Sequence, residues 1–121
     1  MKLYHGTSES PTKIRREGLK PPRCGPCKGL VFLADNPELA INYALTDQER
    51  TGKSKITLVE VDTAYLNPRL LIPDPHHEQW LTDEQGDYSP VETWQDSLRA
   101  SDQCAYAGKI PIRAIVIVNL V

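Results

Sequence analysis

The segment VFLADNPELAINYA at residues 31–44 decides the fold of this chain, because it joins a strand directly to a helix. Its first three residues are apolar and β-prone, which favours a short buried strand. Asp35 or Asn36 can then cap a helix that has Pro37 at its first position. Glu38 would lie beside the positive end of the helix dipole. The sequence therefore predicts a strand that passes straight into a helix.

One face of this predicted helix is apolar. Leu39, Ala40, Tyr43 and Ala44 recur at helical spacing, so we expect all four to face the same side. Tyr43 is thus expected to point inward, toward the preceding strand. Taken alone, an aromatic residue on such a face is an ordinary core residue.

Shorter elements are expected on the N-terminal side of this unit. Residues 3–4 begin a short strand, and the glycine and hydroxyl residues at 5–8 predict a turn. Ser10 followed by Pro11 then predicts the start of a short helix that ends at Gly18. A loop rich in Pro and Gly follows before the central segment.

The C-terminal side contributes more strands. Residues 56–61, 103–106 and 114–121 are rich in β-prone side chains and predict three of them. Helices are expected at 75–81 and 91–100, with a polar, acidic connection between them. Short strands with peripheral helices define an α+β domain.

Length and composition describe one domain over residues 1–121. The formal net charge is −2, and 40% of the residues are hydrophobic. No apolar run is longer than that at residues 114–118, which is far shorter than the roughly 20 residues of a membrane span. The first residues also lack the apolar stretch of a secretory signal. We therefore expect a cytoplasmic monomer with no membrane contact, in which the three cysteines are reduced.

Charge is unevenly distributed along the chain. Between Lys13 and Lys28 there are six bases against a single acid, Glu17, whereas residues 70–98 hold seven acids and no Lys or Arg. The first stretch can attract phosphate, and the second would repel it. Both are equally compatible with solvated surface segments.

Three parts of the chain together resemble the ADP-ribosyltransferase superfamily, in the branch that includes the poly(ADP-ribose) polymerases. They are residues 4–7 (YHGT), the strand-to-helix unit just described, and residues 103–111 before the last strand. In that branch a strand ends in His-Gly-Thr or His-Gly-Ser, and a later Ala-Asp step precedes a helical Tyr by eight residues. Asp35 and Tyr43 have that spacing. The resemblance implies two small packed antiparallel sheets with peripheral helices around an NAD cleft.

The resemblance also implies that NAD is a co-substrate, cleaved between nicotinamide and ribose. Such a reaction passes through an oxocarbenium-like state, so the site must hold the ribose, grip the leaving base and stabilise positive charge. His5 would bond a ribose hydroxyl, the bare Gly6 backbone would approach the nicotinamide amide, and Tyr43 would stack on the ring. The other residues implied to bind NAD are Tyr4, Thr7, Phe32, Ala34 and Ala40.

Two positions depart from the family pattern. Ala40 stands where the polymerases carry a Ser that grips the amide. Gln103 aligns with the usual catalytic Glu, and it can still bond a hydroxyl but brings no charge. We therefore expect transfer of a single ADP-ribose rather than polymer formation. Asp102 and Glu92 are acids close to Gln103 in the sequence that could supply the charge, although Asp102 would face away from Gln103 on a strand.

The cysteine pair supports two rival hypotheses. Residues 24–27, Cys-Gly-Pro-Cys, match the sequence of thioredoxin active sites, but no strand precedes them and no long helix begins there. Cys24 and Cys27 could also bind zinc together with His76 and His77, since C-x₂-C is half of a zinc site. We expect neither redox catalysis nor a metal, and instead a loop over the NAD site whose bases contact an anion.

The sequence leaves three functions open. The first is a mono-ADP-ribosyltransferase that acts on an unidentified protein, nucleic acid or small molecule. The second is a non-catalytic module that binds NAD or an ADP-ribose-like ligand in the same cleft. The third, ranked lower, is an NAD-dependent RNA 2′-phosphotransferase, a class that shares the His-Gly-Thr strand but has an additional N-terminal lobe.

Overall fold

The computed structural model describes residues 1–52, 55–76 and 80–118. Within these ranges, the chain forms three α-helices and two antiparallel sheets. The elements are β1 (Lys2–Thr7), α1 (Pro11–Glu17), β2 (Val31–Ala34), α2 (Pro37–Thr51), β3 (Thr57–Asp62), β4 (Leu71–Pro73), β5 (Trp80–Thr82), β6 (Tyr88–Pro90), α3 (Trp94–Ser101), β7 (Gln103–Tyr106) and β8 (Ile115–Val118), with short 3-10 helices at Thr63–Tyr65, Pro68–Leu70 and Ile112–Ala114. The α+β class is therefore confirmed.

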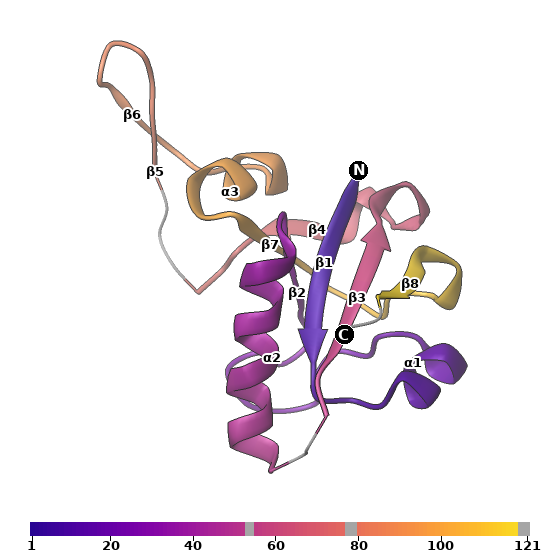
Figure 1. Ribbon diagram of the computed structural model, residues 1–121. Helices are drawn as coiled ribbons and strands as arrows, with labels where there is room; N and C mark the ends of the chain where they lie inside the picture. The colour runs from indigo at the N-terminus through magenta and orange to yellow at the C-terminus, as the bar shows by residue number, and fades with distance from the viewer. Residues whose placement is uncertain (53–54, 77–79, 119–121) are drawn as a thin grey trace.

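The main sheet has the strand order β4-β7-β2-β1-β3-β8. Helix α2 runs along one face of it, beside β1 and β2, and the β5–β6 hairpin projects from the body (Figure 1). The expected pair of packed sheets is wrong in detail, because the second sheet among the described residues is only this peripheral hairpin.

The centre of the main sheet is nevertheless nearly divided. Across the described residues, β1 and β2 pair only at Tyr4 and Ala34, whereas β1 pairs with β3 along its whole length. Strand β2 pairs along its whole length with β7. Two three-stranded halves therefore meet at one residue pair, and the sheet opens between β1 and β2 beyond that pair.

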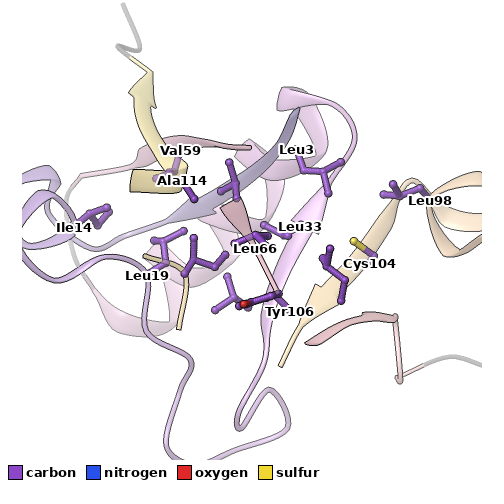
Figure 2. Packing of buried hydrophobic residues seen from close by; sticks show 14 residues of the cluster. Leu3, Ile14, Leu19, Leu33, Val59, Leu66, Leu98, Cys104, Tyr106 and Ala114 are labelled. Atoms are coloured by element: carbon purple, nitrogen blue, oxygen red, sulfur yellow. The ribbon is translucent and has the colours of Figure 1, made fainter. Parts of the chain in front are cut away.

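The hydrophobic core lies on the face of the sheet opposite α2. Leu3, Leu33, Val59, Cys104 and Tyr106 come from four different strands and are all nearly or fully buried. Figure 2 shows them packed together with side chains from the loops and helices that cover this face. Burial of each large apolar side chain contributes roughly 1.5–3 kcal/mol, so this layer is the main source of stability.

The two predicted helix starts are confirmed. Ser10 caps α1 by accepting a hydrogen bond from Lys13 N, and Asn36, rather than Asp35, caps α2 by accepting one from Leu39 N. Both helices carry Pro in the first turn, where its missing N–H leaves no bond unmade. No helix in the described part of the chain is long and apolar enough to cross a bilayer.

Two sequence predictions are wrong. The turn expected at residues 5–8 begins only after Thr7, because the ladder with β3 continues through His5, Gly6 and Thr7. The helix expected at 75–81 is replaced by a turn and by β5, and the acidic connection forms the end of the β5–β6 hairpin. There Asp83 Oδ1 accepts backbone hydrogen bonds, which stabilises the turn locally. Residues 77–79 and 119–121 of the predicted elements lie outside the described residues.

Candidate functional site at the opening between β1 and β2

The backbone of Gly6 is directed into the opening of the sheet. Along an antiparallel strand, successive residues turn their N–H and C=O groups toward alternate neighbours. Thr63 N donates to Met1 O at 2.9 Å on the β3 side, so odd-numbered residues of β1 face β3. Even-numbered residues face β2, where Tyr4 pairs with Ala34. Gly6 is the next of these, and it has no ladder partner on that side among the described residues.

The close approach of α2 to β1 also requires a glycine at position 6. A Cβ atom at this position would lie 1.8 Å from the carbonyl oxygen of Ala40 and 3.0 Å from the Cβ of Ala44. The helix backbone therefore rests directly on β1, and only glycine permits this approach. The glycine of the His-Gly-Thr stretch thus has a structural reason in addition to any contact with a ligand.

His5 bridges the two edges of the opening. Its Nδ1 lies 2.7 Å from the carbonyl oxygen of Phe32 on β2. A carbonyl only accepts, so Nδ1 carries the proton. Burial of the half-buried ring lowers the pKa of His5 below its ordinary value of 6.5, against the opposing effects of the Phe32 carbonyl and Asp47. The neutral ring then has Nε2 as a hydrogen-bond acceptor, which suits a hydroxyl donor.

This lowered pKa predicts a pH dependence of stability. Between the folded-state pKa and the ordinary value of 6.5, the unfolded chain binds a proton at His5 that the folded chain does not. The free energy of unfolding therefore rises with pH in this window, by at most about 1.4 kcal/mol per pH unit. Urea unfolding of wild type and His5→Gln from about pH 5 to 7.5 tests this. The variant is expected to show a flatter slope below pH 6.5, and an unchanged slope contradicts the prediction.

Tyr43 and Gln103, which are 60 residues apart, are in contact. The Tyr43 hydroxyl donates to Gln103 Oε1, so α2 and β7 are joined across β2. Burial and the charge of Asp74 raise the pKa of Tyr43, so its phenol is neutral and acts as a donor. Its hydroxyl reaches across β2, in keeping with the expected inward orientation, but Tyr43 is 42% exposed and is not an ordinary core residue. An exposed ring beside the opening is available for stacking.

A carboxylate that we did not predict lies directly behind Gln103. Asp74 follows β4, and the β4–β7 register, in which Pro73 pairs with Cys104, places it opposite Gln103. Gln103 Nε2 donates to Asp74 Oδ2. Both side chains are buried, at 3% exposed for Asp74 and 8% for Gln103. Neither of the acids considered from the sequence occupies this place, since Asp102 caps α3 with φ 64° and Glu92 is exposed.

Ser97 holds Asp74 and Gln103 in register. Its Oγ donates to the Gln103 carbonyl at 2.7 Å and accepts from Asp74 N at 3.0 Å. Ser97 is fully buried on α3. One hydroxyl therefore ties the helix to the ends of both strands, and Asp74 Oδ2 remains available to accept from the Gln103 amide.

The proline-rich loop closes over this side of the site. His76 Nε2 is 2.7 Å from the Pro26 carbonyl oxygen, and the His76 ring lies 5.0 Å from that of Phe32. His76 N in turn donates to Asp74 Oδ1 at 2.9 Å. The loop is thereby attached to the same short segment that carries Asp74.

Five of the six bases of residues 13–28 fall into two groups, and the sixth, Arg15, is exposed on α1. Lys13, Arg16 and Lys20 lie within 3.4 Å of Glu9 or Glu17 at the surface. Arg23 and Lys28, in the loop itself, make no ion pair with any residue in the described ranges. The charges of these two bases are therefore not offset by a nearby carboxylate among the described residues.

The other residues implied to bind NAD divide into two groups. Tyr4 and Phe32 are half-buried and lie on the strands that border the opening. Thr7, Ala34 and Ala40 are buried, and the two alanines pack between α2 and the sheet. Their side chains therefore shape the site from behind.

The three cysteines lie in different surroundings. All three are free, and Cys24 and Cys27 lie in turns rather than at a helix start. Among the described residues, no group of three or more His, Cys, Asp or Glu side chains could hold a metal ion. His77, the fourth residue of the zinc hypothesis, lies outside those residues.

Thiol reactivity should follow exposure. Burial raises the pKa of Cys104 to about 12, whereas Cys24 is exposed. Because the thiolate is the nucleophile, iodoacetamide at about pH 8 is expected to label Cys24 first and to leave Cys104 unmodified in the folded protein. Peptide mass spectrometry, with a urea-unfolded sample in which all three react as the control, reads this out. Labelling of Cys104 at the rate of Cys24 contradicts the structure.

Comparison with known proteins gives no independent assignment. No protein-family model matches the chain, and no curated protein matches it. The geometry of the candidate site is therefore the basis for the function proposed below.

Proposed function

We propose that this protein is an NAD-dependent mono-ADP-ribosyltransferase that binds NAD at the opening between β1 and β2. The observation that carries the proposal is the contact between Tyr43 and Gln103 beside that opening, since the resemblance names both as site residues. His5 and the Gly6 backbone lie on the other side, on β1. The proposal assigns one of these groups to each part of the reacting bond.

The nicotinamide would be held by Gly6 and Tyr43. A primary amide presents one carbonyl acceptor and one N–H₂ donor, which the N–H and C=O of a single residue can match. Gly6 directs both groups into the opening, and the exposed Tyr43 ring supplies a stacking surface. Together, the hydrogen bonds to Gly6 and the stacking on Tyr43 would fix the orientation of the nicotinamide ring for cleavage of its bond to the ribose.

The ribose would be held by His5 and Gln103. His5 Nε2 accepts from one hydroxyl, and Gln103 Oε1 accepts from another, sharing its lone pairs with Tyr43. When the bond between ribose and nicotinamide breaks, its electron pair leaves with nicotinamide and positive charge develops on the ribose. Acceptors rather than donors around the ribose stabilise that charge. An acceptor nucleophile then bonds to the anomeric carbon.

A non-catalytic module that binds NAD or ADP-ribose is the second candidate. The observation that favours it is the neutral side chain at Gln103, which touches a hydroxyl donor without bringing a charge of its own. Such a protein would use the same contacts for affinity alone. Turnover distinguishes the two candidates.

The test is NAD binding by calorimetry together with nicotinamide release by chromatography, for wild type, Tyr43→Ala and Gln103→Ala. The proposal predicts release by wild type and loss of release in both variants. Binding without release by any form indicates the binding module instead. If folded wild type neither binds NAD nor releases nicotinamide, the proposal is rejected. Release of a 2′-phosphate from RNA in the presence of NAD would favour the phosphotransferase.

A further inference from the structure

The amide of Gln103 has a defined orientation because of Asp74. An isolated Gln side chain can present either its oxygen or its nitrogen to a ligand. Here the Asp74 carboxylate accepts a hydrogen bond from Nε2, so Oε1 must face Tyr43. A carboxylate cannot accept from an amide oxygen, and the reversed amide would therefore place two acceptors against each other. The orientation depends on the charge of Asp74.

Asp74 also places a full negative charge one hydrogen bond behind Oε1. Hydrogen bonds in a chain polarise one another, and the effect is larger where water is excluded. Asp74 and Gln103 are both buried, so the charge is poorly screened. An amide whose N–H₂ group is bound to a carboxylate has a more negative oxygen than a free amide.

We propose that Asp74 is a positioning residue that makes Gln103 act in place of a carboxylate. It fixes Oε1 toward the ribose and supplies, through the amide, the negative charge that Gln103 itself lacks. The inference rests on the proposed function, because it concerns the ribose side of the same site. It explains how a chain with Gln at this position can still stabilise a developing cation.

Among the described residues, four other groups face Asp74. Tyr43 on α2 and Cys104 on β7 are both close enough for its charge to raise their pKa values. His76 contributes a backbone N–H to Oδ1, and Ser97 on α3 binds Asp74 N. The variants at residues 74 and 103 leave all four of these neighbours in place.

The experiment moves the carboxylate from one residue to the other. Asp74→Asn keeps the size of the side chain but removes the charge and allows the Gln103 amide to reverse. Gln103→Glu adds a second carboxylate at hydrogen-bond distance, so the pair must share a proton. The double variant Asp74→Asn with Gln103→Glu restores one carboxylate and one amide in exchanged positions. Nicotinamide release and thermal unfolding are measured for all four proteins across pH.

We expect release by Asp74→Asn to fall about tenfold or more relative to wild type, and release by the double variant to return to the wild-type level or above. Gln103→Glu alone should lose thermal stability as pH rises above about 4.5. The shared proton raises a carboxyl pKa in the folded state, so the folded chain binds more protons than the unfolded chain in that range. The double variant should not show this loss.

The outcomes separate the inference from the proposed function. If wild type releases nicotinamide and Asp74→Asn releases it at the same rate and with the same pH profile, the inference is overturned and the proposed transferase activity stands. Failure of the double variant to recover activity, although it unfolds at the wild-type temperature, also overturns it. Absence of release by wild type rejects the transferase and the catalytic role of Asp74 together, whereas the stability of Gln103→Glu would still show whether the two side chains are paired.

Discussion

Gly6→Ala is expected to destabilise the protein by about 3 kcal/mol or more, enough to lower the midpoint of thermal unfolding by roughly 10 °C. The added methyl group would lie 1.8 Å from the Ala40 carbonyl oxygen and 2.7 Å from its carbonyl carbon. Both atoms belong to the backbone of the first turn of α2, so no rotamer change can relieve the overlap. The helix must move away from β1, which opens the contact between α2 and the sheet. Circular dichroism during heating measures the shift.

Gly108→Ala is the matched control. A Cβ atom there would meet the end of the Leu70 side chain at 3.2 Å, which can shift, and the Tyr106 ring at 3.6 Å, which is an ordinary van der Waals contact. We expect a change below about 1 kcal/mol. Equal thermal midpoints for the two variants would contradict the close approach of α2 to β1.

Tyr43→Ala is expected to weaken NAD binding about 10- to 100-fold, because stacking of a base on an aromatic side chain contributes roughly 1–3 kcal/mol. Since the ring is 42% exposed, removing it should change the free energy of unfolding by only about 1 kcal/mol. Calorimetry with NAD measures the affinity, and urea unfolding measures the stability. Tyr43→Phe, which keeps the ring but loses the bond to Gln103, should bind NAD more tightly than Tyr43→Ala.

Leu45→Ala provides the comparison on the same helix. Leu45 is also 42% exposed, and its removal should alter stability to a similar extent without affecting NAD. A loss of affinity in Leu45→Ala equal to that in Tyr43→Ala would mean that binding responds to the helix rather than to the ring.

The local elements with strong caps could be predicted from the sequence. Pro11 and Pro37 each follow a residue that caps the helix, and both helices begin where expected. These signals depend on bonds within four residues, so they do not require knowledge of the fold. The contact between Tyr43 and Gln103 could be anticipated only through the resemblance, because neither residue carries a local signal of function.

What the sequence could not reveal depends on contacts between distant segments. Asp74 becomes part of the site because β4 pairs with β7 in one register, and a shift by one residue would turn it to the other face. The strand at His5 extends past the expected turn because β3 pairs with it throughout. The β5–β6 hairpin was missed because its aromatic residues, Trp80 and Tyr88, remain exposed and therefore show no burial pattern.

The most direct test of the account is an NMR titration of the ¹⁵N-labelled protein with NAD, and with nicotinamide alone. Gly6 directs its N–H into the opening, and the Gln103 side-chain amide lies beside Tyr43. We predict that both ligands shift the backbone amide of Gly6, and that NAD in addition shifts the Gln103 side-chain amide. Shifts confined to other parts of the chain, or no shift at millimolar NAD, would contradict the placement of the NAD site between β1 and β2.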